Sequence, residues 1–239
     1  MKINIENLSI KYDEKIILRD LNLSIKEGEF VSVLGKSGSG KTTLLNIISG
    51  TVKPDRGKVL IDENEVREIT SKVAYMPQDD LLLPWKNVID NVILYGRING
   101  KKEEARKEAL KNMEAFGLKG YEYSYPDELS GGMRQRAAFL RTALCPADTL
   151  LLDEPFASLD VLTRREMQIW FSDMKSRFNK TVLLVTHDID EALILSDRII
   201  VLAQRPAIVK EEFILTKNSS NFSHDKIKEK IRKILYKDI

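Results

Sequence analysis

The sequence is poor in the residues that form disulfides and bind transition metals: its 239 residues include one cysteine and two histidines. The single Cys145 excludes an internal disulfide, and this cysteine usage fits a reducing, cytoplasmic compartment. Because structural zinc sites take four Cys or His ligands, the sequence gives a zinc site little support.

Long hydrophobic runs are also missing. The longest apolar stretches, 182–185 and 199–203, have the length of strands, whereas a membrane-spanning helix needs about 20 apolar residues. Polar residues interrupt the segment Met1–Asn7, so we expect no secretory signal peptide. If the chain serves transport, the channel itself must lie in another chain.

An excess of charge of one sign is absent as well. The chain has 38 Lys and Arg residues against 36 Asp and Glu residues, a net charge of +2. Nucleic-acid-binding domains usually carry a strongly basic face, so we expect no nucleic-acid partner. Hydrophobic residues make up 43% of the sequence and charged residues 31%, which is ordinary for a globular protein with a buried core.

Strand-like and helix-like patterns alternate along most of the chain. Residues 2–10 and 21–25 alternate polar and apolar side chains, as half-buried strands do, while 30–34, 150–152 and 182–185 are short apolar runs. Strands that alternate with helices predict a mainly parallel sheet covered on both faces. We therefore expect an α/β fold.

The middle of the chain changes to a helical pattern. Apolar residues recur at helical spacing over 102–116, where Gly117 supplies a stop signal, and again over 133–144. The region 79–143 is therefore interpreted as a helical insertion into the α/β core. The division that we expect for a single domain, 1–239, is a nucleotide-binding core with its β portion over 1–78 and 144–205, the insertion, and a C-terminal extension over 206–239.

The C-terminal extension contains a basic amphipathic pattern. Its apolar stripe consists of Ile227, Ile231, Ile234 and Leu235, and lysine and arginine residues surround it. We expect this short helix to pack on its own domain, and contact with anionic lipid is the alternative.

A glycine-rich loop lies between the apolar run 30–34 and a helical pattern over 42–49. This is the strand–loop–helix context that the phosphate-binding motif G-x-x-x-x-G-K-[ST] requires. The residues of the motif are Gly35, Lys36, Ser37, Gly38, Ser39, Gly40, Lys41 and Thr42. Glycines allow the loop to turn its N–H groups toward phosphate oxygens, and the helix N-terminus adds partial positive charge.

The loop predicts a site for a nucleoside triphosphate and Mg²⁺. Lys41 is expected to reach the β and γ phosphates, the Thr42 hydroxyl to bind Mg²⁺, and Thr43 to add a phosphate contact. A glycine-rich turn without a ligand is the plainer alternative. A dinucleotide-binding fold is disfavoured, because Thr43 stands where G-x-G-x-x-G needs its third glycine.

Two acids end the apolar run 150–152, namely Asp153 and Glu154. Buried carboxylates are costly unless something pairs with them, and beside a phosphate loop the natural partner is Mg²⁺. We expect Asp153 to hold the metal through water, and Glu154 to orient or deprotonate the attacking water. A solvated acidic turn is the alternative that the pair alone would favour.

Five further short motifs occur in order along the chain: Tyr12, Gln78, Leu129–Met133, Ser158–Asp160 and His187. With the phosphate loop and the acidic strand, they resemble the ABC ATPase family over nearly the whole chain. They correspond in order to an aromatic residue that stacks on adenine, the Q-loop glutamine, the signature motif, the D-loop and the switch histidine. The resemblance implies a P-loop NTPase core with a mainly parallel sheet, an N-terminal antiparallel β portion and an inserted α-helical subdomain.

The resemblance also implies how the motifs act. Two subunits of this family, here a homodimer formed on ATP binding, sandwich two ATP molecules head to tail. The residues expected to bind the partner's ATP in trans are Ser130, Gly131, Gly132 and Asp160. His187 would contact the γ-phosphate and act in catalysis with Glu154 and Lys41, and Gln78 would bind the Mg²⁺ and link it to the helical insertion.

Some of these residues have plainer interpretations. Gln78 alone would be a solvated side chain, and Tyr12 would be partly buried packing. Asp188 and Glu191 form a capping-box pattern, which would make His187 a neighbour of a helix cap. Met133 stands where many ABC ATPases have glutamine, yet the lysine, both acids and the histidine are present, so an active ATPase is expected.

The segments 79–85, 129–136 and 156–164 resemble the importer branch for nitrate, sulfonates such as taurine, and pyrimidine precursors of thiamine. The implied partners are integral membrane permease subunits and, indirectly, an extracytoplasmic solute-binding protein, with the chain peripheral on the cytoplasmic face of the membrane. Trp85 is a candidate anchor for the permease. For the leucines Leu81–Leu83, a place on the permease-binding surface and a place in the core of the helical insertion are equally favoured. An ABC exporter subunit is the main alternative; a non-transport ABC protein and a P-loop kinase are less favoured.

Overall fold

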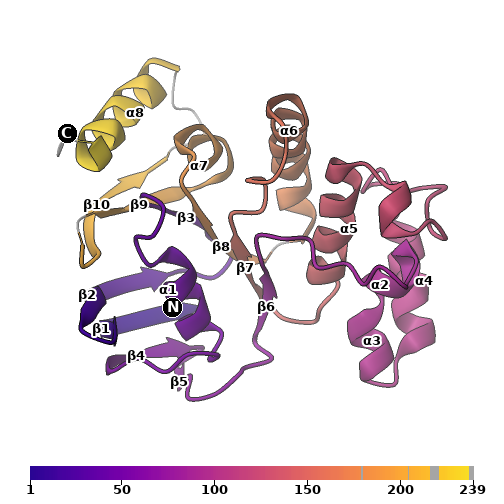
Figure 1. Cartoon of the computed structure of the whole chain (residues 1–239), viewed down its shortest axis with the longest axis horizontal. Helices are drawn as coiled ribbons and strands as arrows, with labels where there is room; N and C mark the ends of the chain where they lie inside the picture. The colour runs from indigo at the N-terminus through magenta and orange to yellow at the C-terminus, as the bar shows by residue number, and fades with distance from the viewer. Residues whose placement is uncertain (179, 204, 216–220, 237–239) are drawn as a thin grey trace.

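The computed structural model describes residues 1–178, 180–203, 205–215 and 221–236, and it has the predicted α/β fold. Its central six-stranded sheet contains β3 (Phe30–Leu34), β6 (Val73–Met76), β7 (Thr149–Asp153), β8 (Thr181–Thr186), β9 (Arg198–Ala203) and β10 (Ile208–Ile214). The strand order is β10-β9-β3-β8-β7-β6 (Figure 1). All neighbours pair in parallel except β10 with β9, so the sheet is mainly parallel, as expected.

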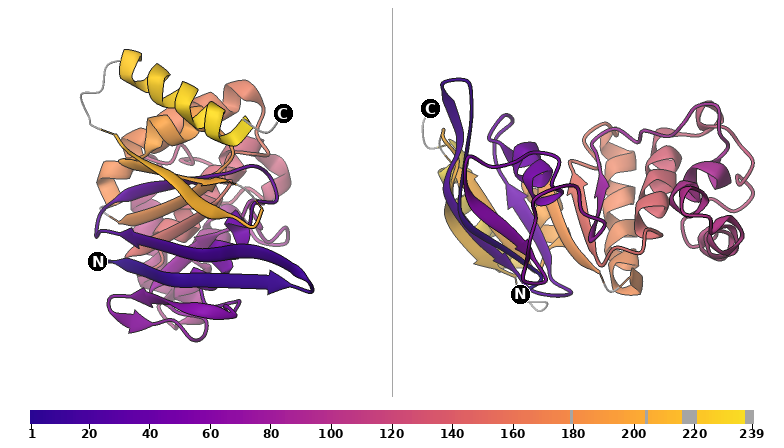
Figure 2. Two further views of the ribbon diagram at one scale, coloured as in Figure 1. Left: turned by 90° about the vertical axis from the view of Figure 1, so that its left-hand side faces the viewer. Right: turned by 90° about the horizontal axis from the view of Figure 1, so that it is seen from below.

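A second, antiparallel sheet comes from the N-terminal part of the chain, which confirms the predicted β portion. Its strands, in the order β2-β1-β4-β5, are β1 (Ile3–Tyr12), β2 (Lys15–Ile25), β4 (Arg56–Ile61) and β5 (Asn64–Glu65). Helix α1 (Lys41–Ile48) packs Leu44 and Leu45 into one hydrophobic cluster with both sheets. The helix that follows the phosphate loop is therefore fixed between the two sheets (Figure 2).

A group of helices lies beyond β6 and β7 (Figure 1). It comprises α2 (Val88–Val92), α3 (Leu94–Ile98), α4 (Lys102–Asn112), the 3₁₀ turn η1 (Pro126–Glu128) and α5 (Gly131–Ala143). The predicted helix over 102–116 is too long, because α4 ends at Asn112 and a turn carries Phe116 into the core. The ring centres of Phe139 on α5 and Phe171 on α6 (Val161–Phe178) lie 4.5 Å apart, so an aromatic cluster joins these helices to the sheet.

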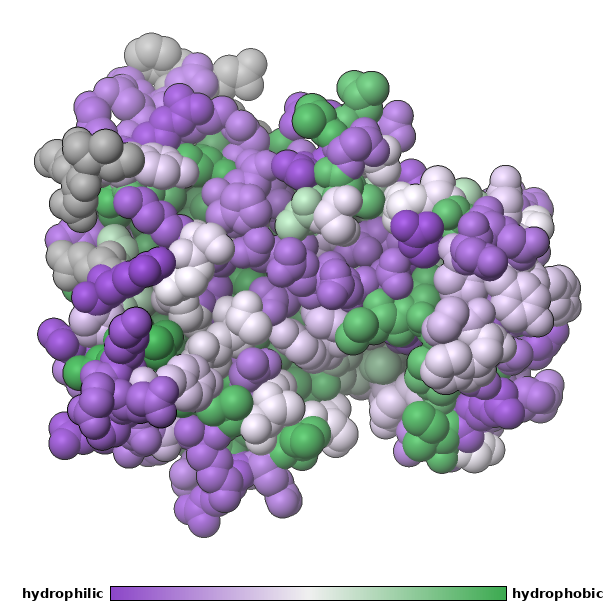
Figure 3. Space-filling model, in the orientation of Figure 1, coloured by the Kyte–Doolittle hydropathy of each residue, from purple (hydrophilic) through white to green (hydrophobic). Residues whose placement is uncertain are grey.

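Two helices cover the sheet near β9 and β10: α7 (Ile189–Leu195) and α8 (Asn221–Tyr236). The stripe of α8 is buried at Ile231 and Leu235 and packs with Phe213 of β10, as the packing interpretation predicts. Among the described residues, none of the helices is both long and apolar enough to cross a bilayer. On the face in Figure 3, hydrophobic side chains lie in small separate groups among hydrophilic ones.

The parallel strands bring the predicted motifs to one edge of the central sheet. Leu34 pairs with Thr186, so the loop after β3 starts beside His187, and Asp153 pairs with Val185 on the other side of β8. β6 ends beside β7, two residues before Gln78. Ligands of open α/β sheets bind at the carboxyl ends of the strands, and this edge is therefore the place to look for a site.

Candidate functional site

The loop 35–40 turns sharply between β3 and α1. Gly40 precedes the helix at φ 87°, in the left-handed region, and a Cβ there would lie 2.7 Å from Ile17 and 2.9 Å from Leu18. No side chain caps the start of α1, and its first turn contains no acid. The first N–H groups of this helix are therefore available to an anion, as the phosphate-binding interpretation requires.

The Lys41 side chain folds back inside this loop and is only 4% exposed. Its Nζ donates hydrogen bonds to the carbonyl oxygens of Gly35 at 2.9 Å and Lys36 at 3.1 Å, and lies 3.2 Å from Oε1 of Glu154. Ser39 Oγ, in the same loop, is buried without a hydrogen-bond partner among the described residues. A cation and an unsatisfied hydroxyl in a glycine loop fit a bound triphosphate.

Asp153 lies next to the loop and is held by two hydroxyl groups. Thr42 Oγ1 donates to its Oδ1 at 3.2 Å, and the Tyr75 hydroxyl donates to its Oδ2 at 2.8 Å. Burial raises the pKa of Asp153, and the bonds from Tyr75 and Thr42 oppose this rise. Burial, and the Asp153 charge, also raise the pKa of Tyr75, so its phenol stays protonated and donates.

These groups fit Mg²⁺ only when it arrives with a nucleotide. The described residues contain no group of three or more His, Cys, Asp or Glu side chains placed to hold a metal. Thr42 and Asp153 offer two oxygens, whereas Mg²⁺ takes six ligands and commonly keeps waters and phosphate oxygens among them. A cation beside Asp153 would also offset the cost of burying this carboxylate.

Glu154 and His187 meet at the ends of β7 and β8. Oε2 of Glu154 lies 2.7 Å from Nδ1 of His187, while Oε1 faces Lys41. The Glu154 backbone has φ 43°, an unusual value for a residue with a side chain, and its N–H donates to the Val185 carbonyl at 2.9 Å. Strained backbone of this kind often marks functional sites.

An open cavity of about 560 Å³ joins these groups, lined by Gly35, Lys36, Ser37, Gln78, Glu154, Ala157, His187, Leu235 and Tyr236. Gln78 therefore shares a cavity with the phosphate loop. The two α8 residues were not predicted: the Lys36 ammonium lies 5.4 Å from the centre of the Tyr236 ring. Tyr12, by contrast, ends β1 with 46% of its surface exposed, so its ring is free to stack on a base.

Gly131 of the signature and Ser158 and Leu159 of the D-loop line a different cavity of about 360 Å³. Ser130 caps α5 by accepting from Met133 N at 3.3 Å, and a Cβ on Gly132 would lie 2.8 Å from Thr163. Asp160 accepts from the N–H groups of Leu162 and Thr163 at the start of α6. A hydrogen bond from the Thr163 side chain, together with these N–H bonds, lowers the pKa of Asp160. Within one chain, these residues do not line the cavity of the phosphate loop.

The segment after Gln78 is fixed on α5. Arg141 donates to the carbonyl oxygens of Asp80 at 2.6 Å and Leu81 at 2.7 Å, and Arg134 pairs with Asp80 at 3.2 Å. Leu82 is buried, whereas Leu81 and Trp85 are 59% and 71% exposed. The sequence left the leucines open between the protein core and the permease surface. The structure places Leu82 in the core, and it places Leu81, like Trp85, at the surface.

The capping box that the sequence suggests at the start of α7 is confirmed for Asp188 and wrong for Glu191. Asp188 does cap the helix, accepting from the N–H groups of Asp190 and Glu191. The Glu191 carboxyl turns inward instead of back to the cap, and accepts from Thr186 Oγ1 at 3.1 Å. His187 thus follows β8 and precedes a helix cap, and its ring still reaches Glu154.

The fold and the phosphate loop define a P-loop nucleotide hydrolase. The sequence profile of the ABC transporter family matches residues 18–157. The formylaminopyrimidine import ATP-binding protein ThiZ of Halalkalibacterium halodurans is 47% identical over 84% of this chain and 79% of its own. The aliphatic sulfonates import ATP-binding protein SsuB 1 of Rhodococcus jostii is 45% identical over 82% and 76%.

A solved dimeric ATP-binding cassette, in a post-hydrolysis state with ADP and Pi, is 33% identical and superposes with a TM-score of 0.74 over 90% of this chain and 99% of its own. The chain thus belongs to the ABC transporter family, as an ATP-binding and ATP-hydrolysing subunit.

Proposed function

We propose that this ATPase energises an ABC importer for a small solute of the nitrate, sulfonate or pyrimidine-precursor type. The observation that carries the ATPase part is the meeting of Lys41, Glu154 and His187 at the ends of three neighbouring strands. The printed names of two relatives, which import formylaminopyrimidine and aliphatic sulfonates, support the importer part. An exporter subunit is the second candidate, because the motor chemistry is shared.

Glu154 is the residue that we assign to activate water. Its carboxylate is held by Lys41 on one side and His187 on the other. Phosphate oxygens would compete for Lys41, which releases Oε1 to accept a proton from a water placed against the γ-phosphate. His187, fixed by Glu154, would face the same phosphate. Mg²⁺, bound through Thr42, Asp153 and Gln78, would neutralise charge on the phosphates.

The hydrolytic site requires a second copy of the chain. None of Ser130, Gly131, Gly132 and Asp160 lines the cavity of the phosphate loop, and Gly131 lines another one. A head-to-tail homodimer would place this helix start of one subunit against the γ-phosphate of the other, where its dipole favours an anion. Hydrolysis is then tied to closure of the dimer.

Permease subunits are the proposed membrane partners, with the chain peripheral on the cytoplasmic face and a solute-binding protein acting indirectly. The exposed pair Leu81 and Trp85 is the proposed docking surface. Because Arg134 and Arg141 hold this segment on α5, force on the surface would reach the signature helix directly.

The test is Glu154→Gln, which removes the base and keeps the shape. Its mass in solution is measured with and without ATP and Mg²⁺, beside hydrolysis. We expect an ATP-dependent shift from monomer to dimer and loss of hydrolysis. Adding Lys41→Ala should abolish the shift, and Glu104→Gln on α4 is the matched control that should hydrolyse normally. Full hydrolysis by Glu154→Gln would refute the assignment of the base.

A further inference from the structure

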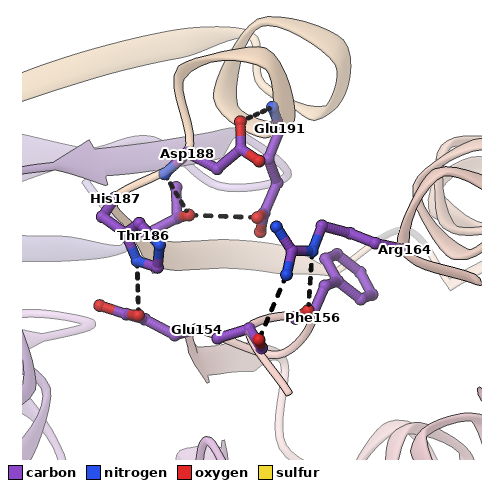
Figure 4. A pocket seen from close by; sticks show the side chains of 8 residues that line it. Glu154, Phe156, Arg164, Thr186, His187, Asp188 and Glu191 are labelled. Carbon is purple, nitrogen blue, oxygen red and sulfur yellow. Dashed lines mark hydrogen bonds and ion pairs between the residues drawn. The ribbon is translucent and has the colours of Figure 1, made fainter. Parts of the chain in front are cut away.

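A small cavity lies behind the pair formed by Glu154 and His187 (Figure 4). Its volume is about 10 Å³, enough for one water molecule and no more. Its walls come from the ends of β7 and β8, the start of α7, and α6, which contributes Arg164. The cavity therefore touches the ends of both strands that carry the catalytic pair.

Glu191 is the buried polar group of this cavity. Its side chain is 3% exposed, and its Oε2 accepts from Thr186 Oγ1 at 3.1 Å. Its Oε1 has no hydrogen-bond partner among the described residues. A buried oxygen without a partner next to space for one water indicates a water-binding site.

Arg164 forms the opposite wall. Its Nε donates to the Phe156 carbonyl at 3.2 Å, and its Nη2 to the carbonyls of Ala157 at 3.3 Å and Leu159 at 2.9 Å. The remaining end of the guanidinium faces the Glu191 carboxyl (Figure 4). Arg164 thus fixes the loop that follows Glu154, and it presents N–H donors to the same space as Glu191.

We propose that this cavity binds one water between Glu191 and Arg164, and that Glu191 is a positioning residue for the catalytic pair. The inference rests on the proposed roles of Glu154 and His187. Thr186 Oγ1, which donates to Glu191, also accepts from Asp188 N at 3.0 Å. Glu191 therefore holds both ends of the turn that carries His187, and through the water it holds the loop after Glu154.

The neutral form is the one that this environment favours. Burial and the charges of Asp188 and Glu154 raise the pKa of Glu191 to about 8, against the opposing effects of Thr186 and Arg164. Besides Glu191, the titratable groups on the cavity wall are Glu154, His187 and Asp188, and Arg164 adds a positive charge.

The two histidines of the chain allow a direct test by NMR of ¹³C-labelled histidine, with His224→Gln to assign the signals. In the wild type we expect the His187 signal to show a titration step near pH 8, from Glu191. Glu191→Gln, which keeps the shape and an oxygen that can accept from Thr186, should remove this step. Glu104→Gln should leave it in place. Persistence of the step in Glu191→Gln, or its absence in the wild type, would overturn the proposal.

Activity gives the second readout. Glu191→Gln should keep kcat within about twofold, while Glu191→Ala should lower kcat at least about tenfold with little change in KM, as misplacement of catalytic groups does. Equal loss in both variants would mean that an ionised carboxylate is required, and would refute the proposal. If Glu191→Ala fails to fold, the wild type and Glu191→Gln still decide. Hydrolysis by Glu154→Gln would instead refute the proposed function and leave the NMR result standing.

Discussion

Tyr75→Phe removes one hydroxyl and isolates the support of Asp153. The phenol donates to Oδ2 at 2.8 Å, while Thr42 occupies the other oxygen. A hydrogen bond to a charged group contributes about 1.5–3 kcal/mol, and loss of such an outer partner typically lowers metal affinity roughly 10–100-fold. We therefore expect the Mg²⁺ concentration at half-maximal activity to rise about tenfold or more, with kcat at saturating Mg²⁺ little changed.

The assay is ATP hydrolysis at saturating ATP over a Mg²⁺ titration, repeated across pH. The bond from Tyr75 lowers the pKa of Asp153, so its loss raises that pKa further. The acid limb of the activity profile should then move to higher pH. Tyr95→Phe, at an exposed position of α3, is the matched control. An unchanged Mg²⁺ requirement in Tyr75→Phe would refute the view that Asp153 holds the metal.

Three other variants test separate parts of the molecule. Glu191→Gln should flatten the pH dependence of the free energy of unfolding. The pKa of Glu191 is raised from 4.5 to about 8 in the folded state, so the wild type loses stability as the pH rises from 4.5 to 8. Urea unfolding from pH 4 to 9 measures this loss. Trp85→Ala should weaken binding to the permease by about 2 kcal/mol or more and spare ATP binding; unchanged co-purification would contradict it. Tyr236→Ala should raise the KM for ATP about two- to fivefold through its loss of contact with Lys36, which Tyr236→Phe should keep.

The sequence was most informative where chemistry sits in consecutive residues. The loop 35–42 and the pair Asp153 and Glu154 carry their own strand and helix contexts, and parallel pairing brings them together with His187 at one sheet edge. Alternation of strands and helices was sufficient for the α/β class. Helix ends were less accurate, because Phe116 keeps helical spacing with α4 while lying in a turn.

The residues that were missed depend on contacts between distant segments. Tyr75 reaches Asp153 only because β6 pairs with β7 in the register that sets Tyr75 opposite Leu151. Tyr236 reaches the phosphate loop because the C-terminal helix packs along β9 and β10. Glu191 has the local pattern of a capping box, and only the space behind Thr186 explains why its carboxyl turns inward.

The loop after Glu154 could couple the cavity of the phosphate loop to the cavity lined by Gly131 and Ser158 in one chain. Its Pro155 carbonyl accepts from the buried Gln135 side chain of α5, and Arg164 of α6 holds the carbonyls of 156, 157 and 159. The signature residues start α5, and the D-loop starts α6. If these helices rotated against the sheet while the Glu154 loop stayed in place, the hydrogen bonds from Gln135 and Arg164 would break. Each buried polar group that lost its partner would cost about 1–3 kcal/mol, so the loop must move with the helices. The homodimer closure proposed above would therefore act at two places: it would bring the signature of one subunit to the phosphate of the other, and it would set the proposed base of the same subunit through Gln135 and Arg164.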